Sequence, residues 1–195
     1  MDSQQINHAL KSRHDLPSHI FKGTFALNQL PCTLIPPFGL VFNSEPLPSE
    51  GQHWMAIFCP AKGVVEYFDT SGSPPLEAES LKNLEQSVSN GQGCRLIYSL
   101  KQIQSECSSV CGEFCVLFLY CRMKGVLLSD FVDLFSSSAL IENDVFVYSL
   151  VHSVFNIPNR DRPYPVLDEA CIQSSRDLKS FFSHQSRSDC PRGRT

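Results

Sequence analysis

The chain has 195 residues, a formal net charge of -4 and 18% charged residues. A chain of this length can bury one core of ordinary size, so we expect a single folded domain. The weakly acidic charge gives no electrostatic reason to expect a nucleic-acid or membrane partner. The sequence also lacks an apolar run of about 18 residues, the length that a membrane-spanning helix needs.

Cysteine usage and the polar start of the chain predict an intracellular, reduced protein. The first residues, from Met1 to His8, lack the basic-then-apolar pattern of a secretion signal. The nine cysteines are an odd number, and no Cys-x-x-Cys pair offers the usual ligand spacing of structural zinc. We therefore expect free thiols, no metal site and no secretion.

The first part of the chain combines a short helix with extended pieces. A short helix is predicted around residues 4–13 in an otherwise polar stretch, and the prolines in 30–37 divide the chain that follows into short extended segments and loops. A strand is predicted over 38–43, and it ends at the Pro- and Ser-containing loop 44–51.

Two apolar runs, 54–59 and 64–69, are predicted to form a hairpin joined by a turn at 61–63. Antiparallel pairing through a short turn brings the start of the first strand beside the end of the second. We therefore expect His53 and Asp69 to lie close together at one end of the sheet.

A helix over 76–88 and a strand over 95–100 are predicted next, followed by a polar turn and an apolar helix that begins at Cys111. Free N–H groups and the positive end of the helix dipole favour a thiolate at such a position. Gly112 has no side chain, which we expect to leave the backbone open to a substrate carbonyl.

The remainder of the chain is predicted to hold two helices and a loosely ordered tail. Ser129 is the expected cap of a short helix that ends at Leu134, and Asn143 or Asp144 is the expected cap of a helix that ends at Phe155. The domain is expected to span 1–157, with residues 158–195 forming the tail.

Four residues supply the groups that a cysteine protease needs. Cys111 is the candidate nucleophile, His53 the proton carrier and Asp69 the carboxylate that orients the imidazole. The side-chain amide of Gln104 and the backbone N–H of Cys111 would stabilise the oxyanion.

These residues resemble the motifs of the adenovirus-type endopeptidases. The likeness rests on His53-Trp54 before a strand, an acid after the next strand, Gln104, and Cys111-Gly112 followed by Phe114-Cys115, and it covers roughly residues 20–155. It implies an α+β, permuted papain-like cysteine protease fold in which a mostly antiparallel sheet packs on the buried helix that starts at Cys111. It also implies cleavage of viral precursor proteins at Gly-containing sites, in the virion and the host nucleus.

The chain departs from this family in ways that affect its expected regulation. Well-known members carry Glu where this chain has Asp69, and they are activated by DNA and by a peptide bound through a disulfide. The resemblance places the peptide-linking cysteine near Cys94. Because this chain is acidic, we expect DNA stimulation to be weak.

Two alternatives remain at this stage. The ubiquitin-like-protein deconjugases share the His-Trp, Asp, Gln and Cys-Gly residues, and the segment Phe68-Asp69-Thr70-Ser71-Gly72 is similar to theirs. Val110 argues against them, because that family usually has Asp before the nucleophile. A binding module that retains a protease fold is the other alternative, although the complete set of catalytic residue types argues against it.

Overall fold

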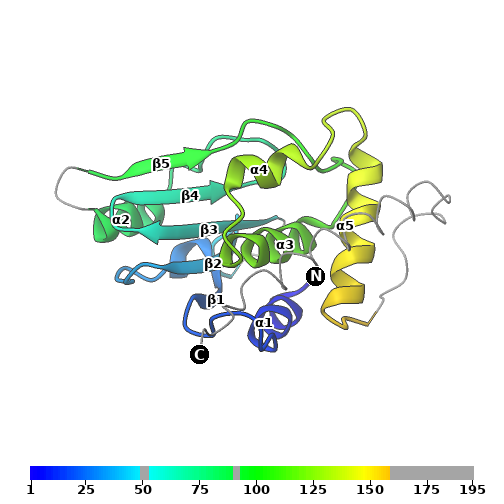
Figure 1. Ribbon diagram of the computed structural model, residues 1–195. Coiled ribbons are helices and arrows are strands. Elements are labelled where there is room, and N and C mark those ends of the chain that lie inside the picture. Colours follow the sequence, from blue (N-terminus) through cyan, green and yellow to red (C-terminus); the bar gives the residue numbers. More distant parts are fainter. Residues whose placement is uncertain (49–52, 90–92, 159–195) are drawn as a thin grey trace, which may run out of the picture.

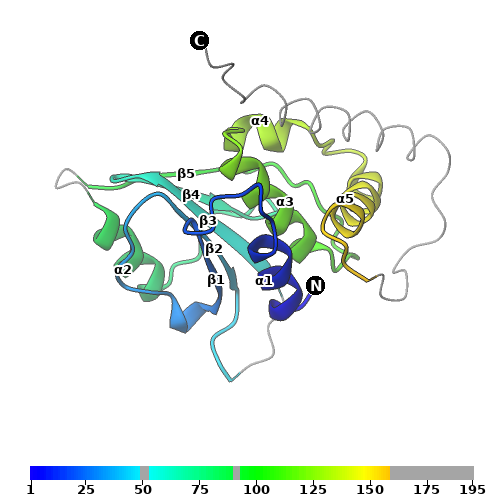
Figure 2. The same cartoon turned by 60° about the horizontal axis from the view of Figure 1, so that its bottom comes forward.

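The structure is a computed structural model that describes residues 1–48, 53–89 and 93–158. It is an α+β fold with a central sheet between two helical layers (Figures 1 and 2). The strands are β1 (Phe21–Ala26), β2 (Phe38–Asn43), β3 (Trp54–Ala61), β4 (Val64–Phe68) and β5 (Arg95–Tyr98). The helices are α1 (Ser3–Lys11), the 3-10 turn η1 (Leu27–Gln29), α2 (Glu79–Val88), α3 (Cys111–Met123), α4 (Leu128–Asp133) and α5 (Leu140–Val154).

The five strands follow the order of the chain, β1-β2-β3-β4-β5. The two central pairings, β2 with β3 and β3 with β4, are antiparallel, whereas the outer pairings are parallel. The sheet is therefore mixed rather than mostly antiparallel. The sequence predicted the β3–β4 hairpin, but the parallel partners follow longer connections whose direction no local pattern reveals.

Alternating residues of β3 place two separate cores on the two faces of the sheet. Met55, Ile57 and Cys59 belong to the core under α2, whereas Ala56 and Phe58 belong to the core under α3. Figure 2 shows α2 on one side of the sheet and α1, α3 and α5 on the other. Every residue of α3 from Cys111 to Arg122 is buried, which confirms the prediction of a helix enclosed by the core.

Several predicted boundaries and caps differ from the structure. β3 continues through Pro60, because the β3–β4 register shifts there and the missing N–H of proline is tolerated at such an irregularity. The N-cap of α4 is Leu127, and α5 begins at Leu140 after Ala139, so Ser129, Asn143 and Asp144 lie inside helices. The predicted tail lies outside the described residues from position 159 onward.

A buried ion pair joins α3 to the sheet. Arg122 Nε lies 2.5 Å from Glu66 Oε2 and Arg122 Nη2 lies 3.0 Å from Glu66 Oε1, with both side chains almost fully buried. Burial raises the pKa of Glu66 even though Arg122 opposes that shift. The pair therefore holds α3 at one place on β4, because separating the two side chains would leave a buried charge without its partner.

We expect Arg122→Met to lower the free energy of unfolding by about 3–5 kcal/mol, because it leaves a buried carboxylate without its cation. The loss should shrink at low pH, where protonation of Glu66 removes the unpaired charge. Urea unfolding measures both effects. Asp133→Ala is the control, since it removes an exposed pair with Lys101 and should change the unfolding free energy by less than about 1 kcal/mol. Equal losses in the two variants would contradict this account.

Candidate active site

His53 and Asp69 lie at the same end of the sheet, as the hairpin predicted. His53 directly precedes β3 and Asp69 directly follows β4, and His53 Nε2 lies 2.7 Å from Asp69 Oδ1. Asp69 is 9% exposed and also accepts a hydrogen bond from the backbone N–H of Ser71 at 2.9 Å. The carboxylate is therefore fixed by its own turn and offers one oxygen to the imidazole.

The electrostatics of this pair favour the charged imidazole. Burial would lower the pKa of His53, but hydrogen bonds to Asp69 and Cys111 outweigh it and raise the pKa to about 10. Burial would likewise raise the pKa of Asp69, yet the hydrogen bonds from His53 and Ser71 hold it below its usual value. Because Nε2 faces Asp69, Nδ1 is the ring nitrogen that remains for the thiol.

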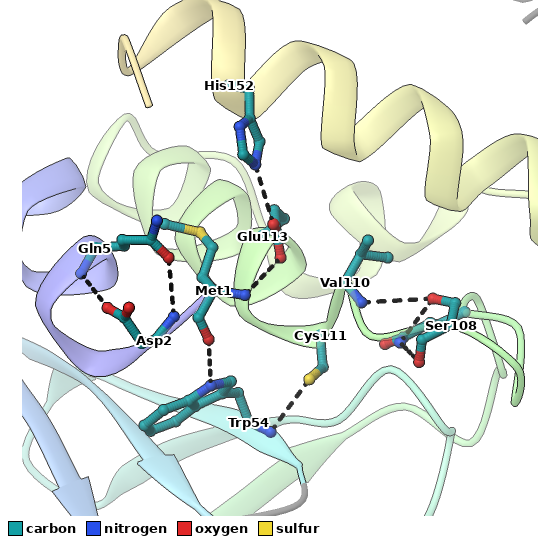
Figure 3. Close-up of polar contacts among 10 residues, drawn as sticks. Met1, Asp2, Gln5, Trp54, Ser108, Val110, Cys111, Glu113 and His152 are labelled. Carbon is teal, nitrogen blue, oxygen red and sulfur yellow. Dashed lines mark hydrogen bonds and ion pairs between the residues drawn. The ribbon is translucent and has the colours of Figure 1, made fainter. Parts of the chain in front are cut away.

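Cys111 is the first residue of α3, and its side chain meets a backbone donor from the sheet. The N–H of Trp54 lies 3.4 Å from Cys111 Sγ (Figure 3). The helix N-cap, Val110, provides no side-chain hydrogen bond to the first turn. The sulfur is therefore held by a donor in β3 and lies beside uncapped helix N–H groups, an environment that stabilises negative charge. Sequence reasoning missed the Trp54 donor, since a backbone N–H leaves no signal beyond its position after His53.

Gln104 lies beside the turn that carries Asp69. Its Oε1 accepts a hydrogen bond from Thr70 Oγ1 at 2.6 Å, and its Nε2 donates to Ser108 O at 3.1 Å and to Ser108 Oγ at 3.0 Å. The backbone N–H of Ile103 also donates to Thr70 O at 3.0 Å. The structure therefore brings the loop before α3 against the turn after β4, and the orientation of the buried amide is set at both ends.

Gly112 does not leave space for a substrate, contrary to our expectation. An added Cβ would lie 3.0 Å from Met1 Cβ, 3.3 Å from Trp54 Cδ1 and 3.4 Å from Ile6 Cδ1. The missing side chain instead allows the N-terminal segment and the Trp54 ring to pack against the first turn of α3. Trp54 Nε1 also donates to Met1 O at 3.0 Å, which holds the indole in this place (Figure 3).

A second buried polar cluster lies behind the thiol. Glu113 is 3% exposed; its Oε2 lies 3.4 Å from the α-amino group of Met1 and its Oε1 lies 3.1 Å from His152 Nε2 (Figure 3). His152 is itself buried and is held by this carboxylate. The cluster ties α3 to α5 and to the start of the chain. Sequence reasoning missed it, because Glu113 looked like an ordinary residue of a helix that begins at Cys111.

Cys94 lies on the other side of the sheet from Cys111. It precedes β5, is partly buried and packs against the core under α2, whereas Cys111 belongs to the core under α3. Burial raises the pKa of the Cys94 thiol. Cys94 and Cys111 therefore belong to opposite faces of the sheet.

The structure has a pocket of about 470 Å³ whose lining includes neither Cys111 nor His53. It lies beside Trp54 and extends along β1 and the end of β2, with Thr24, Asn43 and Glu45 among its lining residues. Within the described part of the chain, no group of three or more His, Cys, Asp or Glu side chains is arranged to hold a metal ion. Over the same residues, no helix combines the length and apolarity needed to cross a bilayer.

The known proteins to which this chain is similar are viral proteases. The chain is similar to the protease of bovine adenovirus 4, with 30% identity over 93 residues, which are 43% of this chain and 46% of that relative. The match therefore spans less than half of the relative's length. Among solved structures, the chain is similar to the ASFV pS273R protease, with 20% identity and a TM-score of 0.46 over 62% of this chain and 44% of the other. No protein-family model matches. The adenoviral relative confirms the resemblance that the sequence motifs indicated.

Proposed function

We propose that this chain is a cysteine endopeptidase with a permuted papain-like fold that cleaves precursor proteins of a virus or virus-like element. The observation that carries the proposal is the arrangement around His53, whose Nε2 lies 2.7 Å from Asp69 while its pKa is raised by both Asp69 and Cys111. Cysteine-type peptide hydrolysis requires a thiol, an imidazole and a carboxylate in contact, and here they meet at the N-terminus of a buried helix.

The proposed reaction has two steps. The Cys111 thiolate adds to the peptide carbonyl carbon, and the carbonyl electron pair moves to the oxygen, which the Gln104 amide and the Cys111 N–H stabilise. His53 then gives its proton to the departing amine as the C–N bond breaks, leaving a thioester. Water attacks the thioester as it loses a proton to His53, the C–S bond breaks with its electron pair on sulfur, and the carboxyl product leaves. This step restores the Cys111 thiolate and the His53 imidazolium.

The substrate class and the place of action follow from the similarity to viral proteases. We propose virion precursor proteins as substrates, cleaved at Gly-containing sites during maturation in the virion and the host nucleus. Support comes from the adenoviral relative. The pocket beside Trp54 offers room for more distant substrate residues, since Cys111 is not among its lining residues. Glycine at the scissile bond would need the least room around a nucleophile that is only 6% exposed.

Activation is proposed to depend more on a peptide than on DNA. A cysteine-containing peptide could form a disulfide with Cys94 and act across the sheet, whereas the net charge of -4 argues against strong DNA binding. Activity assays with DNA at low and physiological salt, and with a cysteine peptide before and after reduction, separate these possibilities. A large DNA-dependent rate increase at physiological salt would contradict the proposed order.

The function is tested with two substrate panels under reducing conditions. One panel holds peptides with internal Gly-Gly and Gly-x bonds, read by mass spectrometry, and the other holds fluorogenic C-terminal derivatives of ubiquitin-like proteins. We expect internal cleavage in the first panel and alkylation of Cys111 by iodoacetamide ahead of the other cysteines. Turnover confined to the second panel would instead identify a deconjugase. No turnover in either, with no preferential alkylation, would support a binding module.

Removal of the Gln104 amide tests the proposed oxyanion site. Gln104→Ala should lower kcat by about 10²–10³-fold with little change in KM, because the amide acts on charge that develops only in the transition state. Gln104→Glu should be at least as damaging, since it replaces a donor by an acceptor. The matched control is Gln86→Ala on the exposed face of α2, which should retain full activity. A Gln104→Ala enzyme with unchanged kcat would remove Gln104 from the mechanism.

A further inference from the structure

The first turns of α5 hold the loop that carries Gln104. Asn143 Nδ2 donates to Ile103 O at 2.9 Å, and Asp144 Oδ2 accepts from the backbone N–H of Ser105 at 3.2 Å. Asp144 is fully buried, and its Oδ1 has no hydrogen-bond partner among the described residues. A buried carboxylate that faces a loop rather than a cation is costly, so its contacts with that loop need an explanation.

Ser108 connects Asp144 to the amide of Gln104. A hydroxyl has one hydrogen to donate and two lone pairs with which to accept. A hydrogen bond from Ser108 opposes the rise in the pKa of Asp144, which places the Ser108 hydroxyl beside this carboxylate. The hydroxyl oxygen accepts from Gln104 Nε2 at 3.0 Å and from the N–H of Val110 at 3.5 Å. The hydroxyl hydrogen and both lone pairs of Ser108 are therefore used. Because a carboxylate oxygen can only accept, Asp144 fixes the direction of the whole chain of hydrogen bonds.

The same chain of hydrogen bonds sets the direction of the Gln104 amide. Thr70 Oγ1 holds the amide oxygen, while the Nε2 acceptors, Ser108 O and Ser108 Oγ, belong to one residue. A single N–H pointed between two such acceptors can serve both as a three-centre bond, which leaves the second N–H for a substrate oxygen. In this arrangement the amide is oriented and still has one N–H to donate.

We propose that Asp144 is a positioning residue that acts through Ser108 to hold the Gln104 amide ready for the oxyanion. This inference rests on the proposed function. It assigns Asp144 no contact with substrate; its effect is on the orientation of a donor that is valuable only when it is preorganised.

Asp144 Oδ2 accepts from the N–H of Ser105, whereas Oδ1 has no partner among the described residues, so the inference distinguishes between two substitutions. Burial raises the pKa of Asp144 to about 6, and a proton on the unpartnered Oδ1 would leave Oδ2 free to accept. Asp144→Asn can keep its oxygen at the Oδ2 position and its amide nitrogen at the Oδ1 position. Asp144→Ala removes the acceptor, and Ser108→Ala removes the link without altering α5.

The test compares reactions that do and do not need the oxyanion site. Peptide hydrolysis and inhibition by a peptide aldehyde both need it, because the Cys111 sulfur adds to the aldehyde carbon and the carbonyl oxygen gains the electron pair and then the imidazolium proton. Alkylation by iodoacetamide, in which the sulfur displaces iodide, does not. We expect Ser108→Ala and Asp144→Ala to lower kcat and aldehyde affinity by about 10-fold or more, with KM and the alkylation rate within about twofold of the parent.

Two further variants complete the comparison. Asp144→Asn should recover most of the kcat lost in Asp144→Ala, and Asp130→Ala, which changes an exposed aspartate of α4, should match the parent. Parent-like kcat and aldehyde affinity in Ser108→Ala would overturn the inference even if Asp144→Ala fails to fold. An equal fall in alkylation would also overturn it, because that result indicates general damage to the site. A parent protein that neither cleaves peptides nor alkylates at Cys111 would refute the proposed function instead.

Discussion

Replacing Cys111 by alanine should abolish peptide cleavage, with kcat reduced by about 10⁶-fold, the scale seen when a catalytic nucleophile is removed from a triad. Among the described residues, the next cysteine of α3 cannot take over the attack, because Cys115 lies one turn further along the helix and is completely buried. Burial also raises the pKa of the Cys115 thiol well above its usual value, so it is not a nucleophile at neutral pH. Cleavage of a Gly-containing peptide, followed by mass spectrometry, measures the loss.

The Cys111 substitution removes a single sulfur atom at the first residue of α3, so the fold should persist. Circular dichroism and urea unfolding check this point. Cys32→Ala provides the matched control, because Cys32 is exposed, unpaired by any disulfide and far from α3 in the chain. Cleavage by the Cys111→Ala protein at the parent rate would show that the activity has another origin. Iodoacetamide labelling that favours Cys32 over Cys111 would point the same way.

The sequence identified the parts of the site that depend on short-range geometry. A hairpin with a short turn leaves little freedom in where its two outer ends lie, so the contact between His53 and Asp69 followed from the pairing alone. A buried helix that starts at Cys111 likewise followed from the unbroken apolar run after a polar turn. These features required no knowledge of the rest of the chain.

The parts that the sequence could not predict depend on contacts between distant segments. Nothing near Glu113 indicates that it meets Met1 and His152, and nothing near Asp144 indicates that it accepts hydrogen bonds from the loop before α3. Asn143 and Asp144 were predicted to cap a helix, because their side chains often accept from a helix N-terminus. The preceding turn of helix already begins at Leu140, and these side chains instead bond to residues 103–108 and 136.

These missed contacts share a consequence for the site. The four residues with predicted roles come from separate segments, and two of them, Cys111 and Gln104, are also held by groups from distant parts of the chain. Trp54 supports the sulfur from the sheet, and Thr70 and Ser108 support the Gln104 amide from two different loops. Reactive groups can therefore be recognised by their type and order, whereas the residues that orient them are visible only after folding.

Asp69→Asn should lower kcat/KM by about 10²–10⁴-fold, the range typical of positioned acid–base groups, and should move the alkaline limb of its pH profile to lower pH. The pKa of His53 is about 10 in the folded protein, against a usual value of 6.5. Burial lowers this pKa, and the bonds to Asp69 and Cys111 raise it. Removing the Asp69 charge therefore lets the imidazolium lose its proton at lower pH, so the leaving amine is no longer protonated.

The same substitution has a defined effect on stability. Because folding raises the pKa of His53, its contribution is fully present below about pH 6.5 and is lost as the pH rises through about 10. Because folding lowers the pKa of Asp69, that contribution is present above about pH 4 and is lost in stronger acid. Urea unfolding should thus show the largest gap between the parent and Asp69→Asn from about pH 4 to 6.5, with the gap closing toward pH 10. Asp130→Asn changes an exposed carboxylate and should show no such pH-dependent gap. A pH-independent gap, or an unmoved alkaline limb, would mean that Asp69 supports the turn after β4 but does not hold the charge on His53.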